Sequence, residues 1–282
     1  MIGRKPELVC IGAQKAATTW FHRVCQARSD IWVPPFKEVH FFDHKFCPEN
    51  RRWIEAGLVR GVERAAARHR KNAKEKRKEP PDPDYLAYLD SLLEQPAFNG
   101  TWYKRVFSRA PNRLMCLDVT PEYSTLPEDG VDFLAQFLKE SRFIYILRDP
   151  ADRAVSQLRM NLTRRKIEPK TPQAWMKYAK DPVIANRGDY KTYVPRWRAR
   201  FSDLNLLFLA YGDVRARPRD VMRTFEAFAG LDREDPWGLT RVVHKGGTLE
   251  VPDSVRAYFE ETFADQTRFI ADEFGADFAA RI

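Results

Sequence analysis

Short apolar runs alternate with amphipathic segments along most of this chain. Four runs, at residues 8–12, 113–118, 142–147 and 205–211, are mostly apolar at consecutive positions, which is typical of strands buried on both faces of a parallel sheet. The segments between these runs repeat apolar residues at helical spacing, and a last segment at 253–274 carries a long aromatic and aliphatic stripe. The alternation predicts an α/β fold, with helices on both sides of a central parallel sheet.

The first predicted strand is followed by a loop and a helix. Lys15 lies in the loop, and the hydroxyl residues Thr18 and Thr19 come where the helix is expected to begin. Free backbone N–H groups and the helix dipole attract phosphate or sulfate at such a position. The loop is not a Walker A motif, because the lysine comes three residues after Gly12 and is followed by alanines. Taken alone, it favours a threonine-capped helix with one exposed lysine.

A second candidate anion site follows the strand at 142–147. Arg148 ends this strand, Asp149 and Pro150 follow, and Ser156 comes two turns into the next predicted helix. A guanidinium and a hydroxyl so placed can bind a phosphate through charge-assisted hydrogen bonds. Ligands of open α/β sheets bind at the carboxyl ends of strands. Two anion sites at two strand ends suit a nucleotide that is phosphorylated at both ends of its ribose.

The length and composition of the chain indicate the number of domains and the charge of its partners. A chain of 282 residues with 44% hydrophobic residues can bury one large core, and we expect a single domain over residues 1–282. The 48 Lys and Arg exceed the 39 Asp and Glu, which favours anionic partners. Much of the excess lies in residues 60–84, a basic segment that ends in prolines. We interpret this segment as an insertion with a solvated helix; steering of an acidic substrate is the alternative.

The remaining composition bears on location and metals. The chain shows neither a signal peptide nor an apolar stretch of about 20 residues, so we expect a cytoplasmic protein without a transmembrane segment. Its four cysteines have neither CxxC spacing nor disulfide density, which favours buried thiols and no bound metal. The sequence does not encode an oligomeric state that we can identify.

Several segments resemble the sulfotransferases that use 3'-phosphoadenosine-5'-phosphosulfate (PAPS), in particular the heparan-sulfate type and its soluble prokaryotic relatives. The sequence IGAQKAATTWF resembles their 5'-phosphosulfate loop, and YILRDPADRAVSQ resembles their 3'-phosphate motif. The segment KEVHFFD, at 37–43, is similar to their loop with the catalytic glutamate. Two further segments are less similar: LDVTPEY, at 117–123, resembles the family's EKTPxY segment, and HKGG, at 244–247, resembles a cofactor loop.

The resemblance implies a P-loop-like three-layer domain with a central parallel sheet flanked by helices. It also implies in-line transfer of a sulfuryl group from PAPS to a hydroxyl or amine, with release of 3',5'-diphosphoadenosine. Glu38 would be the general base, His40 would orient Glu38 or share its role, and Lys15 would stabilise the leaving group. The residues that would bind the cofactor are Lys15, Ala16, Ala17, Thr18, Thr19, Trp20, Arg148, Ser156, Lys245 and Gly246.

One departure concerns the acceptor side of the expected site. Val119 stands where the family has a lysine, so a positive charge near the transferred group is missing, and Asp118 replaces the preceding glutamate. We expect Asp118 to have a structural role. The acceptor itself, whether a small molecule, a carbohydrate or a lipid, is not encoded in these motifs. Aromatic residues that either line the acceptor site or pack in the core are Trp32, Trp53, Trp102 and Tyr103.

Two other functions compete with sulfuryl transfer. A P-loop-type kinase or NTPase is suggested by the apolar run that ends in Asp118, which resembles a magnesium-binding strand end, but the loop with Lys15 does not match its motif. A non-catalytic protein that binds anions or nucleic acid is suggested by the basic segment. The chain has no recognisable nucleic-acid-binding signature, so we expect no nucleic-acid partner.

Overall fold

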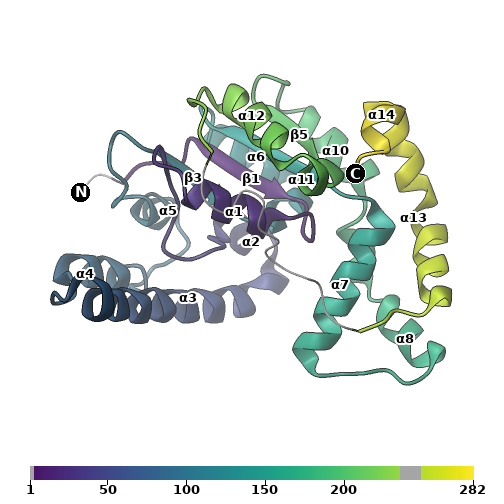
Figure 1. Cartoon of the computed structure of the whole chain (residues 1–282), viewed down its shortest axis with the longest axis horizontal. Helices are drawn as coiled ribbons and strands as arrows, with labels where there is room; N and C mark the ends of the chain where they lie inside the picture. Colours follow the sequence, from purple (N-terminus) through teal and green to yellow (C-terminus); the bar gives the residue numbers. More distant parts are fainter. Residues whose placement is uncertain (1–2, 236–248) are drawn as a thin grey trace.

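A five-stranded parallel sheet forms the centre of the computed structural model, which describes residues 3–235 and 249–282 (Figure 1). The sheet order is β2-β3-β1-β4-β5, and every neighbouring pair is parallel. The α/β fold and its four long strands are therefore as predicted, whereas β2 is too short to appear as a sequence pattern. The strands are β1 (Leu8–Gly12), β2 (Ile31–Trp32), β3 (Met115–Val119), β4 (Arg142–Leu147) and β5 (Leu206–Ala210).

Helices pack around this sheet and extend beyond it at two ends of the molecule. In Figure 1, α3 and α4 lie together at one end, and α7 and α13 lie side by side at the other. Among residues 3–235 and 249–282, no helix is both long and apolar enough to cross a membrane. The helices are α1 (Thr18–Gln26), α2 (Phe41–Phe46), α3 (Arg51–Asn72), α4 (Pro83–Ser91), α5 (Gly100–Val106), α6 (Glu128–Phe137), α7 (Pro150–Arg165), α8 (Pro172–Ala179), α9 (Pro182–Asn186), α10 (Tyr190–Arg198), α11 (Tyr211–Ala216), α12 (Pro218–Ala229), α13 (Asp253–Phe274) and α14 (Ala276–Ala279).

The buried apolar side chains form two clusters. The larger surrounds the sheet, where all five residues of β1 are buried. The smaller lies between α7, α8 and α13 and includes Leu158, Trp175 and Phe259. Each fully buried side chain of this size contributes about 1.5–3 kcal/mol. The smaller cluster fixes α7, which leaves the sheet directly after β4.

The basic segment begins within a helix, α3, one face of which is buried. α3 begins at Arg51, nine residues before the predicted insertion; it buries Leu58 and Val62 in the main core, and Ile54 is buried as well. The chain after α3 reaches the prolines that were expected to end the segment, and Asp82 caps α4 by accepting hydrogen bonds from the first backbone N–H groups of that helix. The basic residues from 60 onward thus begin on a helix whose other face is apolar, and the interpretation of residues 60–84 as an insertion stays a prediction.

The strand ends that were predicted to hold ligands are adjacent. β1 lies between β3 and β4, and all three run in the same direction, so their carboxyl ends meet at one edge of the sheet. Backbone hydrogen bonds tie these ends together, from Ala13 N to Ile146 O at 2.8 Å and from Thr120 N to Cys10 O at 3.0 Å. Gly12 is needed at the end of β1, because a Cβ there would lie 2.6 Å from the Cβ of Ser124.

Candidate active site

The loop between β1 and α1 turns sharply and leaves the start of the helix open. Lys15 and Ala17 have positive φ angles of 73° and 63°, and Ala16 N donates to Ala13 O at 3.1 Å. Ala17 is the N-cap of α1, and no side chain caps the helix. The sequence pattern taken alone favoured a threonine cap, but Thr18 is already inside the helix. The first N–H groups of α1 are therefore available to an anion.

Lys15 is a largely buried cation without a carboxylate partner among the described residues. Its Nζ lies 3.5 Å from the Sδ of Met160, which is its hydrogen-bond acceptor. Burial, followed by the positive charges of Arg164 and Arg148, lowers the pKa of Lys15 to about 8. A cation that is desolvated and surrounded by other cations favours binding of an anion, which would relieve both effects.

Arg148 joins the two loops that were predicted to bind anions. One guanidinium nitrogen donates to Lys15 O at 3.0 Å, another lies 3.8 Å from a carboxylate oxygen of the exposed Asp152, and the group lies 4.4 Å from the centre of the Tyr211 ring. Its Nε is buried and has no hydrogen-bond partner within the described residues. α7 begins at Pro150 as predicted, and it carries Ser156. The structure thus brings Lys15 and Arg148 together.

Glu38 lies within a line of alternating charges that runs from Lys37 to Asp43. Glu38 Oε1 lies 2.7 Å from Lys37 Nζ, and Glu38 Oε2 lies 3.1 Å from His40 Nε2. On its other side, His40 Nδ1 lies 2.7 Å from an oxygen of the fully buried Asp43. Glu38 keeps 26% of its side chain exposed, so an acceptor can reach its carboxylate.

The charges in this line decide which member is a base. Burial alone would lower the pKa of His40, but Asp43 and Glu38 outweigh it and raise that pKa to about 10. Burial alone would raise the pKa of Glu38, but Lys37 and His40 outweigh it and hold that pKa well below its ordinary value. At neutral pH His40 is therefore protonated and donates from both ring nitrogens, while Glu38 is ionised. A protonated His40 can hold and orient Glu38, and the ionised, partly exposed carboxylate of Glu38 is able to accept a proton.

Asp118 holds the backbone that carries this line. Its buried carboxylate accepts hydrogen bonds from Thr120 Oγ1 at 2.7 Å and from the Tyr123 hydroxyl at 3.1 Å. Those two oxygens in turn accept from Val39 N at 2.9 Å and from Phe41 N at 3.0 Å. Burial raises the pKa of Asp118 to about 6, against the effect of these hydroxyl donors. The carboxylate thus fixes the chain on both sides of the histidine, as the structural role expected for it requires.

Lys37 is a site residue that sequence reasoning passed over. At the position of the family's motif lysine, this chain has Val119, which is 3% exposed at the end of β3. Lys37 places a cation next to Glu38, and its positive charge also contributes to the low pKa of Lys15. The signal that could have identified it was its position directly before the predicted base.

A second missed contact involves Gln14, in the loop with Lys15. Gln14 Nε2 donates to Glu122 Oε2 at 3.2 Å, and Arg187 donates to Glu122 Oε1 at 2.6 Å. Burial raises the pKa of Glu122, and the opposing charge of Arg187 limits that rise. The Oε1 of Gln14 is buried without a hydrogen-bond partner in the described part of the chain. This network ties the turn between α9 and α10 to the candidate anion site.

Of the aromatic residues considered for the acceptor side, Trp53 lies beside His40, the histidine that contacts Glu38. It is 41% exposed, and its ring meets the ring of His40 edge to face at 4.8 Å. Trp102 and Tyr103 are 1% and 0% exposed, so they belong to the core. Trp32 is partly buried and also packs against the core.

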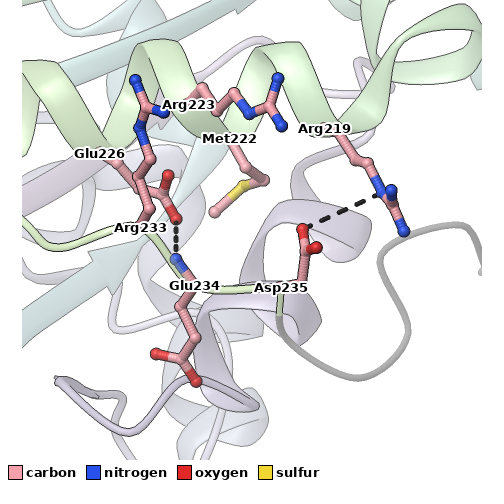
Figure 2. A pocket seen from close by; sticks show the side chains of 7 residues that line it. All are labelled: Arg219, Met222, Arg223, Glu226, Arg233, Glu234 and Asp235. Atoms are coloured by element: carbon pink, nitrogen blue, oxygen red, sulfur yellow. Dashed lines mark hydrogen bonds and ion pairs between the residues drawn. The ribbon is translucent and has the colours of Figure 1, made fainter.

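Some predicted features lie elsewhere. Lys245 and Gly246 fall within residues 236–248, outside the part of the chain that the structure describes. Within residues 3–235 and 249–282, no group of three or more His, Cys, Asp and Glu side chains is placed to hold a metal ion. The pocket in Figure 2, of about 130 Å³, is lined by none of the predicted site residues. Its lining comes from α12 and from Arg233, Glu234 and Asp235.

Comparisons with known proteins agree on one family. Residues 6–235 match the model described as "Sulfotransferase family". The fold is similar to that of a sulfotransferase from Alicyclobacillus acidocaldarius, with a TM-score of 0.64, 19% identity and 98% of each chain covered. A sulfotransferase domain of the curacin biosynthetic pathway has a TM-score of 0.53 and 12% identity, with 96% of this chain and 98% of that chain covered. A sulfotransferase domain of the olefin synthase from Synechococcus PCC 7002 has a TM-score of 0.51 and 13% identity, with 95% of this chain and 96% of that chain covered. No curated protein sequence matches the chain.

Proposed function

The chain belongs to the sulfotransferase family, and from that premise we propose that it transfers the sulfuryl group of PAPS to a hydroxyl or amine, with release of 3',5'-diphosphoadenosine. The observation that carries the proposal is the unpaired charge of Lys15, which lies where the loops after β1 and β4 meet. Lys37, whose charge contributes to the lowered pKa of Lys15, lies 2.7 Å from the ionised carboxylate of Glu38. We propose further that residues 1–282 form one domain, because the smaller apolar cluster is built on α7, which continues directly from the sheet.

The proposed donor site uses both strand ends. The 5'-phosphosulfate would lie at the open start of α1, where Lys15 and the hydroxyls of Thr18 and Thr19 surround it. The 3'-phosphate would take the free Nε–H and neighbouring N–H groups of Arg148, with the hydroxyl of Ser156. Burial, followed by repulsion from neighbouring cations, lowers the pKa of Lys15, and these contacts would offset both effects with favourable charge pairs.

The chemical step is then a displacement at sulfur. The acceptor oxygen or nitrogen forms a bond to sulfur while the bond from sulfur to the bridging phosphate oxygen breaks, and the electron pair of that bond stays on the phosphate. Lys15 stabilises this leaving oxygen, and Glu38 takes the acceptor proton. Each oxygen of Glu38 has one partner and can accept a second hydrogen bond, so the acceptor need not displace Lys37 or His40.

Donor binding would also make Glu38 a stronger base. In the free protein Lys37 and His40 depress the pKa of Glu38, which makes its carboxylate a weak proton acceptor. The negative charges of PAPS, brought close to Lys37, would oppose this effect and raise that pKa. Val119, at the position of the family's lysine, carries no charge. Lys37 would supply the positive charge near the transferred group in its place.

Glu38→Gln tests the base directly. This change keeps the shape of the side chain and removes its basicity, so we expect turnover to fall by about 10²–10⁴-fold. Turnover is measured with ³⁵S-labelled PAPS and the best acceptor of a panel of phenols, sugars, polysaccharides and lipids. Calorimetry with 3',5'-diphosphoadenosine should show unchanged affinity. Full turnover in this variant would exclude Glu38 as the base.

Arg148→Ala tests the donor site separately. Loss of charged hydrogen bonds to the 3'-phosphate should weaken binding of 3',5'-diphosphoadenosine by about 1.5–3 kcal/mol. The matched probe is adenosine 5'-phosphate, which lacks the 3'-phosphate and should lose less affinity in the same calorimetric experiment. Equal losses for the two nucleotides would contradict the assignment of Arg148.

The observations that suggested other functions have structural explanations. The kinase alternative depended on an Asp118 that could hold magnesium, but this carboxylate is fully buried and bound to three hydroxyl groups. The nucleic-acid alternative depended on the basic segment, whose arrangement on α3 supports a more specific proposal.

A further inference from the structure

One exposed face of α3 carries a line of side chains that begins beside the candidate base. Positions separated by three or four residues share one face of a helix. Six positions of α3 meet this spacing, and we refer to them as the α3 stripe. The α3 stripe consists of Trp53, Gly57, Arg60, Arg64, Arg68 and Lys71.

A face of α3 that adjoins the stripe is buried, and the stripe itself is tied to the segment that precedes the base. Ile54, Leu58 and Val62 are buried on that face. From the stripe itself, Arg68 donates to Pro35 O at 2.7 Å, three residues before Glu38. In Figure 1, α3 extends from the neighbourhood of α2 to the edge of the molecule at α4. The orientation of the stripe relative to the candidate base is therefore set by packing.

The positive charge of the stripe is not neutralised by its surroundings. Arg60 and Arg64 are exposed and form no ion pair among the described residues. Lys71 lies 3.9 Å from a carboxylate oxygen of Glu75, but both side chains are more than half exposed, so this pair contributes little. Glu63 is exposed on the neighbouring face of α3 and lies off the stripe.

Trp53 connects the stripe to the catalytic line of charges. Its indole Nε1 donates to Asn50 Oδ1 at 3.1 Å, and its ring packs edge to face on His40, whose Nε2 holds Glu38. An exposed aromatic ring next to a base offers a flat apolar surface to a ring of the acceptor. At 1.5 Å per residue, the stripe extends about 27 Å from this ring.

We propose that the α3 stripe is a binding surface for an acidic polysaccharide, which extends along α3 and presents a hydroxyl or amine to Glu38 next to Trp53. This inference rests on the proposed function. A row of arginines at intervals of one helical turn is complementary to carboxylates or sulfates repeated along an extended chain. Single-stranded nucleic acid is less suited, because its binding surfaces carry several aromatic platforms and the stripe has one, at its end.

Charge reversal on the stripe tests the surface. We compare the double variant Arg60→Glu with Arg64→Glu and a matched control, Arg52→Glu with Arg70→Glu, which makes the same change in net charge at exposed positions of α3 off the stripe. The probes are fluorescein-labelled polygalacturonate and dextran sulfate, with neutral dextran and oligo-dT as comparisons. Binding is followed by fluorescence anisotropy at 50 and 200 mM salt, because exposed charges are screened as salt rises.

We expect both acidic polysaccharides to bind the wild-type protein, neutral dextran not to bind, and the stripe variant to lose about tenfold or more in affinity, since like charges then face each other. The control variant should lose less than about threefold. Equal losses in the two variants, absence of binding to both acidic polysaccharides, or tighter stripe-dependent binding of oligo-dT would each overturn the inference.

The same proteins are titrated with 3',5'-diphosphoadenosine by calorimetry, which separates this inference from the proposed function. Unchanged nucleotide affinity in the stripe variant, together with the polysaccharide result above, supports the surface. If the nucleotide does not bind the wild-type protein, the proposed function fails while the anisotropy experiment still decides whether the stripe binds acidic polysaccharides.

Discussion

Two buried cations lie near the two ends of α1 and have opposite surroundings. Arg28, beyond the end of the helix, is fully buried and pairs with Asp30 at 2.7 Å and with the buried Glu226. Burial alone would lower the pKa of Arg28, but these carboxylates outweigh it and raise that pKa. Lys15, before the helix, has no carboxylate partner among the described residues, and its pKa is lowered to about 8.

The difference separates a cation whose charge is paired within the protein from one whose surroundings favour an added anion. Figure 2 shows Glu226 at the pocket beside α12, where it also accepts a hydrogen bond from Glu234 N at 3.0 Å. The Arg28 cluster thus completes its own pairing and joins α1 to α12. Lys15 instead weakens the free protein, because a desolvated charge is left uncompensated. Under the proposed function, the sulfuryl donor would supply the missing negative charge.

Removal of Arg28 should give the largest effect on stability. Arg28→Met leaves the carboxylate of Glu226 buried and unpaired, so we expect the free energy of unfolding to fall by about 3–5 kcal/mol. Urea unfolding followed by circular dichroism measures this loss. The double variant with Glu226→Gln should recover part of it, because no buried charge is then left alone. A loss below about 1 kcal/mol in the single variant would remove the contrast with Lys15.

Removal of Lys15 should affect catalysis and leave stability intact. Lys15→Met retains the apolar length of the side chain and removes the charge on the leaving group, so turnover with labelled PAPS should fall by about 10²–10³-fold. Its free energy of unfolding should be unchanged or higher, because an uncompensated buried charge is gone. Loss of stability comparable to that of Arg28→Met would show that Lys15 is structural.

The pH dependence of nucleotide binding should depend on the protonation of Lys15. Lys15 is protonated below its pKa of about 8, so affinity for 3',5'-diphosphoadenosine should be constant below that pH and fall by up to about tenfold per pH unit above it. The lowered pKa also means that the unfolded chain holds this proton more tightly, so stability should rise as pH increases from about 8. Calorimetry and urea unfolding between pH 7 and 10 check both trends, which should be absent in Lys15→Met.

Removal of an exposed ion pair should have the smallest effect on the free energy of unfolding, and it serves as the reference for Arg28 and Lys15. Lys170 Nζ lies 3.2 Å from a carboxylate oxygen of Glu168, and both side chains are more than two thirds exposed. Lys170→Ala should change the free energy of unfolding by less than about 0.5 kcal/mol, because water and salt screen the pair. A larger change in urea unfolding would mean that burial is not what distinguishes Arg28 and Lys15.

Features with a local cause were predictable from the sequence. Consecutive apolar residues predicted the four long strands, and Pro150 marked the start of the helix after β4. Lys15 and Arg148 were candidates because each lies in the loop after a predicted strand, and parallel strands bring their carboxyl ends to one edge. The motif around Glu38 was recognisable because its residues are contiguous. Adjacency in the chain is sufficient for all of these features.

Charge balance and exposure were decided by the tertiary structure alone. Arg28 meets a carboxylate from residue 226, whereas Lys15 meets none among the described residues, and no sequence pattern distinguishes the two. Packing likewise buries Trp102 and leaves Trp53 exposed beside the candidate base, although both are tryptophans in polar surroundings of the sequence. The amino-acid order determined which groups lie at the strand ends. Their partners depend on which distant segments pack against them, because burial and electrostatic pairing act through space.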